Sequence, residues 1–130
     1  MKNFVNDKYV HSELSGKIIG VAYDVQNAIG PGRPEKTYQL AMSKGFDLAG
    51  IKYRQQVVAP ILFKEIKVGS RRFDFVVENK VLVELKVGVR FNHADFEQVY
   101  EYLKMSGLQL GLIILFSSNC VKVHRVPNVK

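Results

Sequence analysis

The chain has 130 residues, 47% hydrophobic and 24% charged, which is typical of a globular domain and not of a disordered chain. The length predicts one domain, over residues 1–130. A single cysteine, Cys120, excludes an internal disulfide framework, and no apolar run has signal-peptide or membrane-spanning length. These features predict a cytoplasmic protein with no membrane partner.

Positive charge is the first functional signal. Nineteen Lys and Arg residues oppose twelve Asp and Glu residues, which leaves a net charge of +7 at pH 7. A basic protein attracts polyanions, nucleic acid above all. The basic residues are spread through the part that should fold, from Lys64 to Arg90, and form no dense tail. A basic face is therefore the expectation.

Two helices are expected near the N-terminus. Apolar residues recur at helical spacing from Ile18 to Ile29, which predicts an amphipathic helix over residues 12–29. The stretch GPGRP ends that helix. Pro34 suits the first turn of a second, short helix, and Gly45 suits its C-terminal cap.

The middle of the chain predicts consecutive strands. β-branched and aromatic residues favour four of them, at 53–63, 65–68, 71–77 and 81–87. The connecting turns are placed at Gly69-Ser70 and at Glu78 to Lys80.

A helix and two strands complete the predicted order ααββββαββ. The helix starts after Asn92 as N-cap and ends at Gly107. The nearly all-apolar segment 108–118 predicts a central strand buried on both faces, and the alternating segment 121–126 predicts an edge strand. The expected fold class is α/β or α+β, with a mixed central sheet flanked by helices.

Charged residues interrupt the most strand-like segment, RRFDFVVENKVLVELK. Pairing 71–77 with 81–87 about Asn79 sets Asp74 opposite Glu84 and Arg72 opposite Lys86. Alternation then puts one set on a polar face, namely Arg72, Asp74, Val76, Leu82, Glu84 and Lys86. The core face receives the other set, namely Phe73, Phe75, Val77, Val81, Val83, Leu85 and Val87.

Two opposed carboxylates need compensation. At about 5 Å they repel by roughly 3 kcal/mol at an effective dielectric near 20. A shared proton, a cationic neighbour such as Lys86, or a bound metal can relieve this, and Mg²⁺ is typically held by one or two carboxylates. The alternative interpretation is a solvated polar face with ordinary cross-strand ion pairs.

Three more polar residues extend the pattern. Glu35 lies in the first turn of the second helix, and Gln98 and Tyr102 share one face of the later helix. Taken singly, Glu35 also fits a helix-dipole partner, and Gln98 and Tyr102 fit a rim position.

Together these residues resemble a known set. GRPEKTY, residues 32–38, matches the signature of the GxxExxY protein family. FDFVVENKVLVELK resembles the Asp…Glu-x-Lys core of the PD-(D/E)XK nuclease superfamily, and QVYEY resembles the Gln-x-x-x-Tyr motif of its RecB-like branch. The motifs occur in the expected order over residues 12–118. Phe73 departs from the Pro of the superfamily name, and Pro34 departs from the usual aliphatic residue before Glu35.

The resemblance implies a restriction-endonuclease-like core and Mg²⁺- or Mn²⁺-dependent hydrolysis of phosphodiester bonds in nucleic acid, with DNA favoured over RNA. The implied metal ligands are Asp74, Glu84, the Leu85 carbonyl and Glu35. Lys86 would orient the nucleophile or stabilise negative charge, and Gln98 and Tyr102 would hydrogen-bond near the scissile phosphate. The implied nucleic-acid contacts are Arg71, Arg72, Arg90 and Tyr38, and His93 is either a further contact or structural.

Two other functions stay open. One is a non-catalytic module on the same fold that binds nucleic acid or protein. The other is a small structural or oligomeric protein whose acids are merely solvated. A short chain with an edge strand is also compatible with a homodimer.

Overall fold

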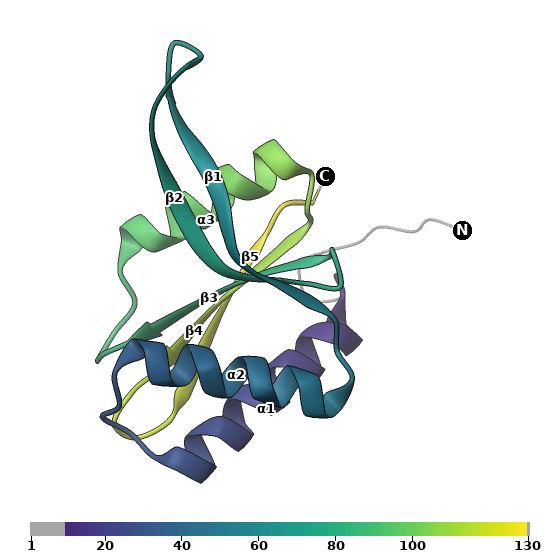
Figure 1. Ribbon diagram of the computed structural model, residues 1–130, viewed down its shortest axis with the longest axis vertical. Coiled ribbons are helices and arrows are strands. Elements are labelled where there is room, and N and C mark those ends of the chain that lie inside the picture. Colours follow the sequence, from purple (N-terminus) through teal and green to yellow (C-terminus); the bar gives the residue numbers. More distant parts are fainter. Residues whose placement is uncertain (1–9, 130) are drawn as a thin grey trace.

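The computed structural model describes residues 10–129, which form one mixed sheet with helices on both faces (Figure 1). The elements are α1 (Ser12–Ile29), α2 (Glu35–Ala49), β1 (Tyr53–Phe63), β2 (Ile66–Val77), β3 (Val81–Val87), α3 (His93–Ser106), β4 (Leu110–Phe116) and β5 (Val121–Pro127). The strands lie side by side in sequence order. Only β3 and β4 are parallel, because α3 carries the chain back between them. The predicted α+β class with a mixed, helix-flanked sheet is confirmed.

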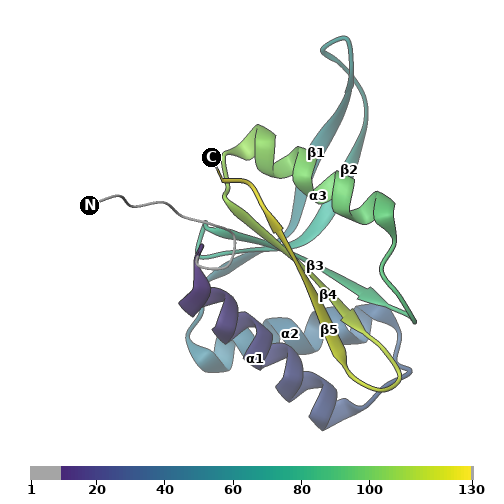
Figure 2. The same cartoon turned by 180° about the vertical axis from the view of Figure 1, so that it is seen from behind.

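Each face of the sheet has its own apolar core. Side chains of α1 and α2 pack against one face, around Phe46, Phe75 and Leu112. The other face packs against α3, around Phe73, Leu82 and Val99. Figure 2 shows the same two layers from behind, with α3 on the side of the sheet opposite to α1 and α2.

The last two strands follow the prediction from their hydrophobic patterns. Every residue of β4 is buried, because this strand lies between β3 and β5 and is covered on both faces. Strand β5 lies at an edge of the sheet and alternates between buried and accessible residues. No helix within residues 10–129 combines the length and apolarity needed to cross a bilayer.

The predicted count of four strands before α3 is wrong. Residues 66–77 form one continuous strand, β2, so Gly69 and Ser70 lie inside a strand and not in a turn. The actual turn is Lys64-Glu65, where both residues have positive φ. The strand pairs with β1 along its length. Between Ile61 and Leu62 of β1 the register shifts, because their partners are Gly69 and Lys67 and β2 has one additional residue between these two. The observed order is ααβββαββ.

The predicted end of the second helix at Gly45 is also wrong. Helix α2 continues to Ala49 and is capped by Gly50, whose φ of 71° is left-handed. Gly45 serves close packing, because a Cβ there would lie 2.5 Å from Cγ1 of Val21 on α1. A glycine that looked like a stop signal is thus a contact point between two helices.

Strands β1 and β2 extend well beyond the rest of the sheet. We call their outer part, residues 57–72, the arm. It projects past α3 in both views (Figures 1 and 2). The arm lies at the open edge of the sheet, because β1 has a strand neighbour on one side only.

The alternation of β2 breaks at Asp74. Phe75 and Val83 pair as predicted, and Phe75 faces the α1–α2 core. Phe73, however, belongs to the core under α3, so the prediction that it shares a face with Phe75 is wrong. On β1, Gln56 interrupts the pairing opposite this point with a φ of 51°.

The predicted polar face is only partly polar. Val76 and Leu82 lie on it as expected, yet both are fully buried beneath α3. Charge is confined to the end of this face, beyond the last paired residues of β2 and β3.

Candidate active site

A cluster of polar side chains occupies the point where β2 and β3 separate. The β2–β3 ladder ends at Phe75 and Val83. One residue further on, the backbone N–H of Leu85 donates to Oδ2 of Asp74 at 2.7 Å, and the N–H of Asp74 donates to Oε1 of Glu84 at 3.1 Å. Side-chain carboxylates thus take the place of backbone acceptors, which draws both acids into the gap between the strands.

Helix α2 contributes a third side to the cluster. The Gln39 amide donates from Nε2 to Oδ1 of Asp74 at 2.7 Å, and the same nitrogen lies 3.4 Å from Oε2 of Glu35. Glu35 and Gln39 are one turn apart on α2, so both face the end of the sheet. Gln39 therefore links the helix acid to the strand acid.

Lys86 is the cation of the cluster. Its Nζ lies 3.8 Å from Oε2 of Glu84 and 3.6 Å from Oδ1 of Asp95, in the first turn of α3. The Lys86 side chain is 33% exposed, against 15% for Glu84 and 16% for Asp95. A half-buried ammonium between two mostly buried carboxylates is poorly screened by solvent.

The two strand acids titrate as a pair. Burial, reinforced by the charge of Asp74, raises the pKa of Glu84 to about 8. Burial also raises the pKa of Asp74, although the Leu85 N–H and the Gln39 amide favour its ionised form. The hydrogen bonds therefore assign the negative charge to Asp74 and the proton near neutral pH to Glu84.

The pKa values of the other two groups follow from their neighbours. Burial lowers the pKa of Lys86, but the surrounding carboxylates outweigh it and the net shift is upward. Lys86 is thus an ammonium at neutral pH. Partial burial raises the pKa of Glu35, with smaller contributions from Asp74 and Asp95.

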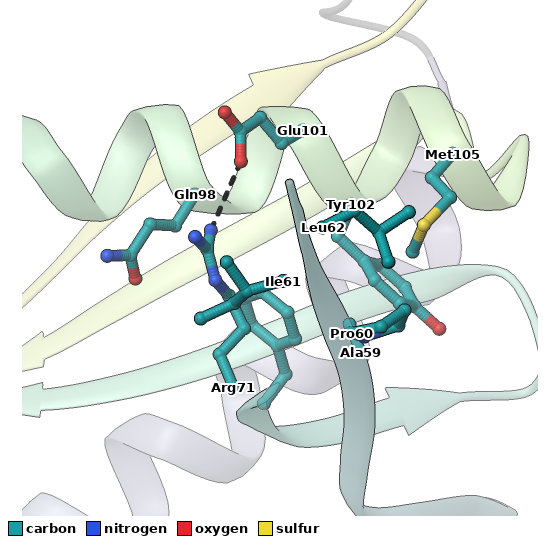
Figure 3. A pocket seen from close by; sticks show the side chains of 10 residues that line it. Ala59, Pro60, Ile61, Leu62, Arg71, Gln98, Glu101, Tyr102 and Met105 are labelled. Atoms are coloured by element: carbon teal, nitrogen blue, oxygen red, sulfur yellow. Dashed lines mark hydrogen bonds and ion pairs between the residues drawn. The ribbon is translucent and has the colours of Figure 1, made fainter. Parts of the chain in front are cut away.

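Gln98 and Tyr102 lie beside this cluster without contacting its carboxylates. They line a pocket of about 290 Å³ between α3 and the arm (Figure 3). Gln98 is exposed, and the Tyr102 ring packs against Phe73 with centroids 5.1 Å apart. Gln98 follows Asp95 by three residues on α3, so it lies on the same face of the helix as the residue that pairs with Lys86.

The four predicted nucleic-acid contacts have different surroundings. Arg72 and Arg90 are exposed, whereas Arg71 is half-buried with its Nη1 3.2 Å from Oε1 of Glu101, across the pocket in Figure 3. Tyr38 is fully buried, stacks on Phe116 and donates its hydroxyl to the Gly30 carbonyl at 2.6 Å.

The prediction that Tyr38 contacts nucleic acid is therefore wrong for this structure, because its side chain has no accessible surface. Exposed His93 lies 3.6 Å from Glu97, one turn along α3. A surface pair of this kind fits the structural alternative for His93, and its role as a nucleic-acid contact stays a prediction.

Sequence reasoning missed two members of the cluster. Gln39 is four residues after Glu35, a spacing that places both on one helix face. Asp95 was visible only as an acid in the first turn of a helix, which is a common feature in its own right. Its proximity to Lys86 depends on how α3 crosses the sheet.

Comparison with known families decides the relationship. Residues 12–126 match the PD-(D/E)XK nuclease superfamily. The chain belongs to that superfamily. The residues predicted from the Asp…Glu-x-Lys pattern, Asp74, Glu84 and Lys86, lie within this matched range, at the point where β2 and β3 separate. No curated protein matches the chain significantly.

A solved structure supports the fold of this superfamily member. The crystal structure of a protein named SSO0001 aligns with a TM-score of 0.54 and 14% identity. The alignment covers 95% of this chain but only 62% of the SSO0001 chain. The likeness therefore concerns the fold, and this chain spans less than two thirds of that larger protein.

The donor chemistry of the cluster fits a hard divalent cation. Two adjacent carboxylates provide oxygen ligands, and burial raises the pKa of both although the Lys86 ammonium acts in the opposite direction. In an extended strand the N–H and C=O of one residue point to the same side, so the Leu85 carbonyl faces the same gap as its N–H. Within residues 10–129, however, no three His, Cys, Asp or Glu side chains are already spaced for a metal.

Proposed function

We propose that this protein is a Mg²⁺- or Mn²⁺-dependent nuclease that hydrolyses phosphodiester bonds, with DNA as the favoured substrate. The observation that carries the proposal is the pair Asp74 and Glu84, held together between two separating strands with Lys86 3.8 Å from Glu84. Membership of the PD-(D/E)XK nuclease superfamily supports it. The match of residues 32–38 to GxxExxY supports a place in that family.

Asp74 and Glu84 would hold the metal, with the Leu85 carbonyl and Glu35 as further oxygen ligands. A bound divalent cation lowers the pKa of water and neutralises charge on a phosphate. Gln39 holds Oδ1 of Asp74 at 2.7 Å and so leaves the orientation of that carboxylate little freedom. Glu35, more exposed than the strand acids, would bind directly or through water.

Lys86 acts as a fixed positive charge. Its raised pKa keeps it protonated near neutral pH, so it cannot serve as the base that deprotonates a nucleophile. Its ammonium would instead stabilise the negative charge that develops on the phosphate and orient the attacking water. Asp95 holds it from α3 at 3.6 Å.

The polar residues beyond the cluster would bind the substrate. Gln98, on the same face of α3 as Asp95, would hydrogen-bond near the scissile phosphate, and Tyr102 would extend this contact toward the arm. Arg72 and Arg90, both exposed, would contact the phosphate backbone.

A cleavage screen combined with metal titration tests the proposal. We expect calorimetry to detect Mn²⁺ binding to the wild type and not to Asp74→Asn, which keeps the shape of the side chain. We expect the wild type to cleave at least one of single-stranded, duplex or branched DNA with Mg²⁺ or Mn²⁺. The Glu97→Gln variant, altered at an exposed α3 residue that pairs with His93, is the matched control.

The rival proposal is a non-catalytic nucleic-acid-binding module. Lys86 is already engaged by Glu84 and Asp95, and no three-ligand metal group is preformed within residues 10–129, which favours this alternative. Nucleic-acid binding that persists in EDTA and is unchanged in Asp74→Asn, with no cleavage of any substrate, would replace the nuclease proposal.

A further inference from the structure

The arm exposes an unusual amount of apolar surface. Its large side chains Val58, Leu62, Phe63, Ile66 and Val68 are each between 53% and 64% exposed. Single apolar residues are normal on a surface, and neighbouring positions such as Leu62 and Phe63 face opposite sides of the arm. Phe63 and Ile66 pair directly, so these two exposed apolar side chains lie next to each other and mark a candidate site of interaction. Phe63 and Ile66 form the last pair before the Lys64-Glu65 turn, so apolar groups reach the very end of the projection.

Positive charge accompanies this apolar surface. The arm carries Lys64, Lys67, Arg71 and Arg72 against a single acid, Glu65. Lys64 lies over the Phe63 ring, with Nζ 5.6 Å from the ring centroid. A symmetric contact between the arms of two copies would bring these like charges together, whereas a polyanion would neutralise them.

The position of the arm connects it to the candidate active site. Strand β2 carries Asp74 at its inner part and Ile66 at its outer end, eight positions away. At about 3.3 Å per residue the tip lies about 26 Å from Asp74, the length of roughly eight base pairs. One strand thus joins the carboxylate to the projecting tip.

We infer that the arm is a second nucleic-acid contact, whose tip inserts Phe63 and Ile66 against bases about eight nucleotides from the scissile phosphate. Apolar side chains contact bases at places where the bases are unstacked, such as a duplex end, a fork or a kink. Lys64, Lys67 and Arg72 bind the flanking phosphates. The inference rests on the proposed function, because the distance is counted from Asp74. An arm of this kind selects substrates with unpaired or distorted segments.

The test is equilibrium binding to forked DNA and to blunt duplex of matched sequence, measured by fluorescence anisotropy in EDTA. We expect the wild type to prefer the fork, and Phe63→Ala to bind the fork about tenfold more weakly with the same salt dependence. Phe63→Trp should restore the affinity. Lys67→Ala should instead lower the slope of log K against log salt by about one. Leu48→Ala is the control, because Leu48 is 90% exposed on α2, outside the arm.

A base analogue tests the distance separately. With 2-aminopurine placed at successive positions from the cleavage site, we expect the fluorescence change that depends on Phe63 to peak about eight nucleotides away.

Several results would overturn the inference. Equal affinity of Phe63→Ala and wild type for the fork would do so even if metal-dependent cleavage is found, which leaves the nuclease proposal intact. Failure of the wild type to bind any DNA would overturn both. A dimer in analytical ultracentrifugation that Phe63→Ala converts to a monomer would show that the arm serves self-association. Arm-dependent binding without any cleavage would overturn the nuclease proposal together with the eight-nucleotide distance from a scissile phosphate, and would support only the contact between the arm and the bases.

Discussion

Asp74 accepts the backbone N–H of Leu85 at 2.7 Å, at the place where β2 no longer pairs with β3. A candidate metal ligand therefore also has a structural task, since it satisfies a buried donor that the sheet leaves without a strand partner. The Asp74 carboxylate thus has a structural role and a proposed catalytic role, so substitutions of Asp74 must be chosen to separate the two effects.

The first prediction separates these tasks. Asp74→Ala removes the acceptor of the buried Leu85 N–H, and we expect it to lower the free energy of unfolding by about 1–3 kcal/mol. Asp74→Asn retains a carbonyl oxygen at this position, so its stability should stay closer to wild type. Both variants should lose metal-dependent cleavage. Urea unfolding in EDTA measures the first effect, and equal stabilities of Ala and Asn variants would contradict it.

The second prediction concerns pH and the Glu84 proton. In the folded, metal-free protein the pKa of Glu84 is raised to about 8, above the ordinary value of 4.5. Between these values the folded state binds more protons than the unfolded state, so stability falls as pH rises from about 4.5 to 8. Thermal unfolding in EDTA across this range should show the fall, and Glu84→Gln should reduce it.

Added Mg²⁺ provides the complementary measurement. A cation that binds the ionised pair stabilises the folded state by mass action, so it should oppose the loss of stability at the upper end of the pH range. Mg²⁺ should not stabilise Glu84→Gln to the same extent. A wild-type stability that is flat with pH would show that Glu84 is not the proton carrier.

The third prediction concerns the support of Lys86. Asp95→Asn removes one of the two ion-pair partners of Lys86, which should lower the pKa of the lysine and reduce the cleavage rate by about tenfold. Lys86→Met should abolish cleavage. Glu97→Gln, on the same helix, should leave the rate unchanged. Initial rates measured against pH distinguish a weakened cation from a general loss of folding, because only the former changes the basic limb of the profile.

The fourth prediction uses two glycines in helices. Gly45→Ala places a Cβ 2.5 Å from Val21 Cγ1, so it should destabilise the contact between α1 and α2. Gly20→Ala, in α1, meets no atom within 4 Å and should be stabilising, by about 0.5–1 kcal/mol. Chemical denaturation of the two variants checks both signs, and an increase in stability for both would contradict the packing role of Gly45.

Local sequence patterns determined much of this protein. The spacing of apolar residues predicts α1 at its observed bounds, Asn92 caps α3 through its side chain, and the apolar run of β4 indicates its buried place in the sheet. The Asp…Glu-x-Lys pattern and its neighbours also indicated the superfamily. These features depend on residues close in sequence, where periodicity and capping chemistry suffice.

Tertiary contacts decided the rest. As a glycine, Gly45 predicts the end of a helix, but its close contact with Val21 makes it a packing position inside α2. Pairing with β1 likewise keeps Gly69 and Ser70 inside strand β2. Asp95 meets Lys86 only because α3 crosses the sheet. Such contacts join residues far apart in the chain, and the free energy of burying them together outweighs local preference. The sequence alone therefore indicated which residues carry charge in the strands, and the fold decided which of them share a site.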